Sequence, residues 1–257
     1  MDDSRVGALF VLCSGAGFGT LGVLGVVAGE EGLSIPTVLF FRFALATVLV
    51  WSVLAVRGEL RLLSGRNLLV GVALGAFGYA AMSGLYFVGL EFMTAGMVGI
   101  VLYTYPVFVL VLAAAFLDEV VDRQRVAALL VTLGGIALIT GADPAAADPR
   151  GVGIVLVAAV VYATYITVSR TTLTDVSAPT LTAHVLPAAA STFLFIGLAT
   201  NSLSIPSTGV GWGAVVGIAV VATAMPIFAF FAGLSATYNR RRDTYLIEAT
   251  FLILQQR

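Results

Sequence analysis

Eight long apolar stretches run through this chain, and the short segments between them hold most of its charges and turn-forming residues. The stretches cover residues 6–28, 37–56, 68–89, 95–117, 126–142, 151–168, 180–199 and 212–236. A helix needs ~20 apolar residues to cross the hydrocarbon core of a bilayer, which matches these lengths. Strands of a membrane barrel would instead alternate over ~10 residues, a pattern that the sequence lacks. The sequence therefore predicts an all-α polytopic membrane protein.

The composition supports the same fold class. Apolar residues make up 60% of the chain, charged residues make up 11%, and the mean hydropathy is +1.05. A water-soluble domain carries ~25% charged residues, so a soluble fold is excluded. The sequence also lacks a basic patch flanked by aromatic residues. We therefore expect the lipid bilayer as a partner, and no nucleic acid.

The placement of the arginines predicts the orientation of the chain, because cytoplasmic connections of membrane proteins are enriched in basic residues. All 13 basic residues are arginines. With a cytoplasmic N-terminus, the cytoplasmic side holds Arg5, Arg57, Arg61, Arg66, Arg123, Arg125, Arg170, Arg240, Arg241, Arg242 and Arg257. Arg150 then lies outside, and Arg42 lies within the membrane. We therefore expect a multi-pass protein of the cell (plasma) membrane with its N-terminus in the cytoplasm.

A faint internal repeat divides the chain. Pro36-Thr37 precedes the second apolar stretch, and Pro179-Thr180 precedes the seventh, 143 residues later. Five spans separate the two copies, so the second copy is inverted in the membrane, as in many secondary transporters. The sequence predicts a five-helix repeat over 6–142, an incomplete three-helix repeat over 151–236, and an atypical cytoplasmic tail over 237–257.

Three passages together resemble one family of carriers. They are Phe40-Phe41-Arg42-Phe43-Ala44-Leu45-Ala46, then Thr94-Ala95-Gly96 through Tyr105-Pro106 to Phe116-Leu117-Asp118-Glu119 and Gly134-Gly135, and lastly Ala158 to Tyr165. In their order and spacing they resemble the EamA-type members of the drug/metabolite transporter superfamily. The likeness extends over most of residues 6–236.

The resemblance implies a carrier of ten helices in two inverted five-helix repeats, of which eight helices are present here. It further implies that the carrier exports a small metabolite, amino acid-like or drug-like, by alternating access and with proton coupling as a common feature. A small-molecule substrate is the expected partner, and we expect no cofactor and no metal.

Arg42, a charged residue within a predicted span, is the strongest single candidate for substrate binding. It lies about six residues into the second span from the outer side, roughly 9 Å deep at ~1.5 Å per residue. A charge at that depth is costly unless it faces protein or water. We expect it to anchor an anionic group of the substrate or to act in a gate. The alternative is a structural arginine that caps carbonyl groups or extends to the interface.

His184, the only histidine, lies in the seventh span. Histidine titrates near physiological pH, so His184 is a candidate for proton coupling. The alternative is a histidine that is hydrogen-bonded within the packing of the helices.

Tyrosines and prolines within the spans are candidates for the substrate path. Pro106 lies near the middle of the fourth span, where it removes a backbone hydrogen bond and should kink the helix, as Pro187 and Pro226 should in the seventh and eighth. The tyrosines expected to line a cavity are Tyr79, Tyr86, Tyr103, Tyr105, Tyr162 and Tyr165. The alternative is that they only pack between helices.

The end of the fourth span carries a candidate structural ion pair. Glu119 follows the span, and Arg123 lies one turn further on. We expect the pair to join the fourth and fifth spans at the cytoplasmic boundary.

Two other classes of function compete with a carrier. An intramembrane enzyme is not expected, because one histidine and no carboxylate within the spans exclude a zinc H-E-x-x-H site and an aspartate pair, leaving only Ser191 with His184. An ATP-driven pump is excluded, since a chain without lysine has no P-loop. The three-helix second repeat leaves a further alternative: a truncated, non-transporting remnant, or a half-carrier that acts only as a homodimer.

Overall fold

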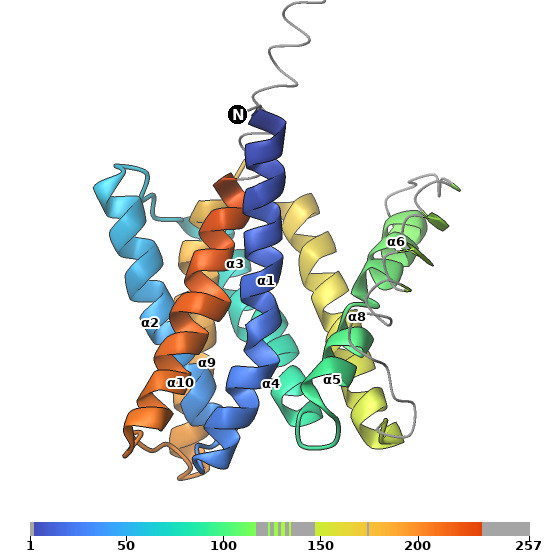
Figure 1. The fold of residues 1–257 in the computed structure, drawn as a ribbon. Helices are drawn as coiled ribbons and strands as arrows, with labels where there is room; N and C mark the ends of the chain where they lie inside the picture. Colours follow the sequence, from blue (N-terminus) through green and yellow to red (C-terminus); the bar gives the residue numbers. More distant parts are fainter. Residues whose placement is uncertain are drawn as a thin grey trace, which may run out of the picture.

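The computed structural model describes residues 3–116, 147–173 and 175–232, together with six isolated positions between 123 and 134. The elements of these ranges are helical (Figure 1): α1 (Asp3–Glu30), α2 (Ile35–Val56), α3 (Gly65–Ala73), η1 (Leu74–Tyr79), α4 (Ala80–Gly89), α5 (Ala95–Leu102), α6 (Tyr105–Phe116), α8 (Pro149–Thr172), α9 (Ala178–Ala199), α10 (Gly209–Ala219) and η3 (Val220–Ala224). The two elements labelled η are turns of π-helix, one within the third span and one within the last described span.

Seven helical spans of the described residues are long and apolar enough to cross a membrane. They coincide with seven of the predicted stretches, so the prediction of an all-helical polytopic membrane protein is confirmed for this part of the chain. The predicted span at 126–142 lies mostly outside the described residues, and the predicted tail at 237–257 lies wholly outside them. The count of eight spans therefore stays a prediction.

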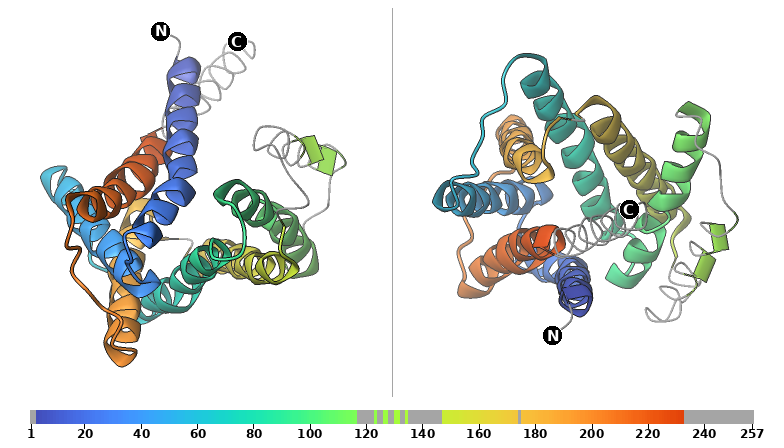
Figure 2. Two further views of the ribbon diagram at one scale, coloured as in Figure 1. Left: turned by 60° about the horizontal axis from the view of Figure 1, so that its bottom comes forward. Right: turned by 90° about the horizontal axis from the view of Figure 1, so that it is seen from above.

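The helices form a bundle in which α2, α9 and α10 lie on one side and α5, α6 and α8 lie on the other (Figure 2). The most extensive packing joins α2 to α9, and α8 packs against both α4 and α6. Leu39 and Phe43 of α2 form the core with Leu186 and Phe193 of α9 and Ile218 of α10. The core thus joins segments from the two ends of the sequence.

The helices α2 and α9 begin in the same way. Each has 22 residues and carries a proline in its first turn. The hydroxyl of Ser34 accepts a hydrogen bond from the backbone N–H of Thr37, and the hydroxyl of Ser177 accepts one from that of Thr180. Such side-chain acceptors satisfy amide groups that have no partner at a helix start. The matched starts, 143 residues apart, support the prediction of an inverted repeat.

Each of the two π-helical turns lies in the third span of one predicted repeat. Turns of this kind occur frequently at functional sites. η1 packs against α8 and α9, whereas η3 packs against α1 and α2. A Cβ atom on Gly75 of η1 would lie 2.6 Å from the carbonyl oxygen of Val185, so this contact requires glycine. Each π-turn therefore lies against helices of the other half.

A hydrogen bond compensates for Pro187 inside α9. Proline has no N–H, so the carbonyl group four residues earlier, that of Ala183, loses its helical donor. The indole N–H of Trp51 on α2 donates to this carbonyl oxygen at 2.7 Å. The bond satisfies the carbonyl group and links α2 to α9.

Candidate functional site

Arg42 lies in the interior, only 2% exposed. Its Nε–H donates to the hydroxyl oxygen of Thr223 in η3 at 3.0 Å. The hydroxyl of Thr223 in turn donates to the carbonyl oxygen of Ile218 in α10 at 2.8 Å, so its one proton is already engaged. The hydroxyl oxygen is therefore held in place as an acceptor for the guanidinium.

The guanidinium also lies close to aromatic side chains of α2, η1 and α4. Its Cζ atom lies 4.8 Å from the centre of the Phe43 ring, a cation–π contact. Tyr79, the last residue of η1, and Tyr86 both lie within electrostatic range of it. Arg42 consequently hydrogen-bonds η3 through Thr223 and lies near Tyr79 of η1, whose ring packs against Phe43.

The described interior has no negative charge to balance this cation. The acidic side chains that the structure describes all belong to helix ends or connections: Glu30, Glu31, Glu59, Glu91, Asp148 and Asp175. An uncompensated charge in a membrane interior marks a functional group or a substrate path as the first hypothesis. The arrangement is suited to an anionic ligand.

Five of the six predicted tyrosines form one continuous cluster. Ring-centre distances are 5.7 Å from Tyr79 to Tyr165, 6.0 Å from Tyr165 to Tyr162, and 4.7 Å from Tyr162 to Tyr105. Tyr103 extends the cluster at 6.5 Å from Tyr105. The cluster begins beside Arg42, because Tyr79 also contacts Phe43 at 5.5 Å. The sixth residue, Tyr86, lies near Arg42 instead and is buried.

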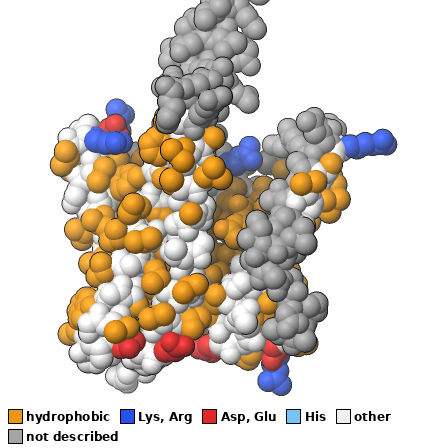
Figure 3. Space-filling view, in the orientation of Figure 1, with side chains coloured by type: hydrophobic (Ala, Val, Ile, Leu, Met, Phe, Trp, Pro, Cys, Tyr) orange, Lys and Arg blue, Asp and Glu red, His pale blue; other side chains and the backbone are white. Residues whose placement is uncertain are grey.

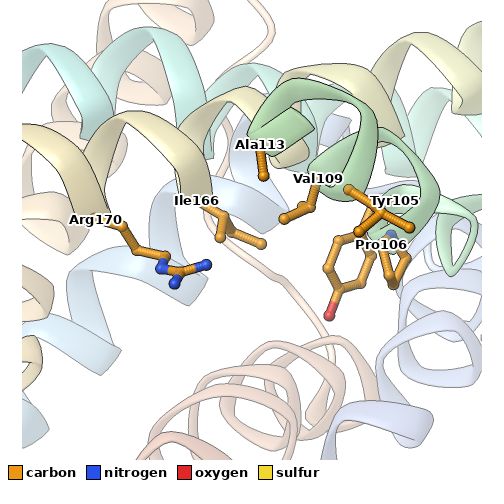
Figure 4. A pocket seen from close by; sticks show the side chains of 7 residues that line it. Tyr105, Pro106, Val109, Ala113, Ile166 and Arg170 are labelled. Carbon is orange, nitrogen blue, oxygen red and sulfur yellow. The ribbon is translucent and has the colours of Figure 1, made fainter. Parts of the chain in front are cut away.

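A hollow of about 320 Å³ lies between α6 and α8, next to the tyrosine cluster (Figure 4). It is lined by Tyr105, Pro106, Val109, Leu110, Ala113, Ile166 and Arg170. Five of these seven side chains are apolar, and the two polar groups are a phenol and a guanidinium. The volume is that of a small-molecule site.

The regular helical hydrogen bonding of the fourth span is interrupted just before this hollow. α5 ends at Leu102 and α6 begins at Tyr105, so Pro106 occupies the first turn of a new helix, where its missing N–H costs nothing. Thr104 donates its hydroxyl to the carbonyl oxygen of Val101 at 2.7 Å across the interruption. The break sets Tyr103 and Tyr105 beside each other at the level of the tyrosine cluster.

Both ring nitrogens of His184 have partners. Nε2 accepts a hydrogen bond from the backbone N–H of Leu63 at 3.1 Å, and Nδ1 lies 2.9 Å from the carbonyl oxygen of Thr180. The tautomer that satisfies both contacts is neutral, with the proton on Nδ1. The side chain thereby ties the connection between α2 and α3 to α9. Ser191 donates to the carbonyl oxygen of Pro187 instead of to this ring.

Other predicted site residues are placed as follows. Pro187 lies inside the continuous helix α9, and Pro226 follows η3 at the point where α1 approaches, with Ser14 donating to its carbonyl oxygen at 2.8 Å. Glu119 lies outside the described residues, and Arg123 is exposed. The ion pair between them therefore stays a prediction.

Two polar residues of the site were not among the predicted binding residues. Thr223 carries no signal by itself, since a threonine within an apolar span is unremarkable. Arg170 lies eight residues after Tyr162, which places both residues on one face of a helix. That spacing was a usable signal.

Charge is distributed unevenly along the bundle (Figure 3). Most basic side chains in view gather at the end where α1 begins, and most acidic side chains lie along the opposite end. Arg57, Arg61 and Arg66 surround the connection from α2 to α3, whereas Glu30, Glu31 and Glu91 belong to connections at the other end. The distribution supports a cytoplasmic N-terminus by the positive-inside rule.

Comparison with known proteins gives a consistent picture. The EamA-like transporter family matches residues 5–141. A protein of Archaeoglobus fulgidus, named an uncharacterized transporter, is 28% identical over 154 residues, which is 60% of this chain and 54% of that protein. The chain thus spans about half the length of this relative.

The fold is also similar to that of a solved structure titled only as the crystal structure of a protein. The TM-score is 0.66 at 20% sequence identity, over 90% of this chain and 78% of the other. At this level of identity the likeness concerns the fold.

Proposed function

The chain belongs to the EamA-like transporter family, and from this premise we propose that it exports a small anionic metabolite across the plasma membrane by alternating access. The observation that carries the proposal is the buried guanidinium of Arg42, which lies between two π-turns without a carboxylate from the described interior. Substrate sites of secondary transporters lie near the midplane, between the two repeats. Arg42 would hold the anionic group there.

Alternating access needs contacts between the halves that are able to exchange. The polar contact from Arg42 to Thr223 and the close packing of Gly75 on Val185 both join a π-turn to a helix of the other half. An anion on the guanidinium would compete with Thr223 for its N–H donors. Differential binding of this kind is what allows a ligand to shift a conformational equilibrium.

Proton coupling through His184 is part of the proposal. Protonation of Nε2 would remove the acceptor for the N–H of Leu63 and release the connection between α2 and α3. This connection lies at the end of the bundle that we assign to the cytoplasm.

The proposal is tested by transport in proteoliposomes with three matched probes: 4-phenylbutyrate, its neutral amide and 4-phenylbutylamine. We expect uptake of the acid above that of protein-free vesicles, with a further increase under an imposed pH gradient. The proposal would be contradicted if only the amine were taken up, or if none of the three probes were taken up. Absence of transport for every probe would favour the non-transporting alternative.

The homodimer remains a separate hypothesis within this proposal. A half-carrier would transport only in the paired state, so the same preparation should be sized by light scattering in mild detergent. Transport by vesicles that each hold one monomer would exclude this hypothesis.

A further inference from the structure

We propose that the hollow between α6 and α8 is a loading site for an amphipathic anion, and that Arg170 is the residue that recruits the anionic group. The inference rests on the proposed function and adds a second subsite to it, at a distance from Arg42. It also narrows the substrate class to molecules with one anionic end and an apolar body.

The two helices present matching faces to the hollow. Tyr105, Val109 and Ala113 of α6 are spaced by four residues, so they lie on one face of that helix. Tyr162, Ile166 and Arg170 have the same spacing on α8. Eight residues correspond to roughly 12 Å along a helix. The hollow is therefore an elongated groove that suits an extended small molecule.

The two ends of this groove differ in chemistry. At one end the rings of Tyr105 and Tyr162 meet at 4.7 Å and join it to the tyrosine cluster. At the other end Arg170 lies in the last turn of α8 and is exposed. Figure 4 shows Tyr105 and Arg170 at opposite ends of the hollow, both directed into it. The guanidinium of Arg170 therefore lies at the exposed end of the groove, and the rings of Tyr105 and Tyr162 lie at the other end.

The charges of the site select the sign of the ligand. Arg170 contributes the only charged side chain among the seven lining residues, and the five apolar ones offer no partner for a polar group. An ammonium group would be repelled by the guanidinium, and a neutral polar head would gain less from it than a carboxylate, which forms charge-assisted hydrogen bonds. The groove thus matches a carboxylate with a hydrocarbon or aromatic body.

The tyrosine cluster links this groove to the interior site. From Tyr105 the rings continue through Tyr162 and Tyr165 to Tyr79, which packs against Phe43 beside Arg42. A ligand released from Arg170 would meet aromatic faces and phenol groups over this whole path before it reaches the second guanidinium. The two arginines then act in sequence, Arg170 in loading and Arg42 in holding.

The test is equilibrium binding of 4-phenylbutyrate and its amide to the full chain in nanodiscs of phosphatidylcholine, without any gradient. We expect Arg170→Gln to weaken binding of the acid about five- to tenfold and to leave binding of the amide unchanged. Arg150→Gln is the matched control, because Arg150 lies in the first turn of the same helix and should leave both affinities unchanged. Ile166→Trp fills the groove and should abolish binding of both compounds in protein that elutes as a single species.

Three results would overturn the inference. One is equal loss of acid and amide affinity in Arg170→Gln, and another is an unchanged acid affinity in that variant. The third is no binding of 4-phenylbutyrate in pure phosphatidylcholine together with retention of phosphatidylglycerol that Arg170→Gln abolishes, which would assign the groove to a lipid headgroup. Binding is measured without transport, so the two claims are tested separately. A negative binding result would not contradict the proposed export function, and a negative transport result would not contradict binding in the groove.

Discussion

The Nε of Arg42 lies 3.0 Å from the hydroxyl oxygen of Thr223, a residue 181 positions later in the chain. The bond joins the second span to the π-turn of the last described span and uses a threonine whose proton is already engaged by Ile218. The same guanidinium reaches Tyr79 in the other π-turn. One side chain thereby links the two places where the regular helical hydrogen bonding is interrupted by a π-turn.

Removal of the hydroxyl acceptor should destabilise the protein. Thr223→Val keeps the shape of the side chain but leaves the buried Nε–H without its partner, at a cost of ~1–3 kcal/mol in the free energy of unfolding. Thr223→Ser retains the hydroxyl and should cost less. Thermal unfolding in one detergent compares the two variants, and an equal loss for both would show that packing of the methyl group is what matters.

The close approach of η1 to α9 predicts a strong dependence on residue size. Gly75→Ala would place a Cβ 2.6 Å from the carbonyl oxygen of Val185 and 2.7 Å from the Cβ of Ala188, so the helices must separate. Overpacking of this kind costs ~1–3 kcal/mol.

Gly15 is the matched control for that substitution, since a Cβ there would meet nothing within 4 Å. Gly15→Ala should therefore leave the melting temperature unchanged or raise it slightly. A melting temperature that falls equally in the two variants would contradict the packing that we describe.

The bond from Trp51 to Ala183 gives a test of coupling. Trp51→Phe leaves the carbonyl group of Ala183 unsatisfied, because Pro187 offers no N–H, and should cost ~1–3 kcal/mol. Pro187→Ala supplies that N–H from within the helix.

The two substitutions should therefore not be additive. In a double-mutant cycle we expect Trp51→Phe to cost less in the Pro187→Ala background, with a coupling energy of ~0.5–3 kcal/mol. Strict additivity would mean that the indole bond and the missing helical bond are independent.

The contact of His184 predicts a local effect of pH. A proton added at Nε2 would remove the acceptor of the Leu63 N–H and break this bond. Hydrogen exchange at Leu63, corrected for intrinsic rates, should lose protection on acidification. In His184→Gln the protection should no longer depend on pH, and transport should lose its pH dependence with it. Persistent pH dependence of both in the variant would exclude this role.

Much of the fold could be predicted because it follows from local patterns. The length of each apolar stretch determines where a span lies. Ser34 and Ser177, which precede Pro-Thr pairs, mark the starts of α2 and α9. The interruption of the fourth span follows from Pro106, which cannot continue the hydrogen bonding of α5. These signals lie within a few residues of the feature that they predict.

The remainder depends on contacts between distant segments. The π-turns have no periodic signature, since η1 and η3 have only alanine in common and both lie within uniformly apolar spans. Nothing near Thr223 indicates that it faces Arg42, and the groove at Arg170 exists only because two separate helices bring matching faces together. The tyrosines could be predicted as a set, whereas their order from Tyr79 to Tyr105 required the packing of α8 between η1 and α6.

The most direct test of the central claim is uptake of 4-phenylbutyrate by proteoliposomes holding wild-type protein, Arg42→Ala or Arg42→Lys. If Arg42 holds the anionic group, Arg42→Ala should lower the initial rate at least tenfold, and Arg42→Lys should keep part of it because the charge remains. Equal reconstitution and a single elution peak must be shown for each variant. Full transport by Arg42→Ala would contradict the claim and leave Arg42 as a structural link between the two π-turns.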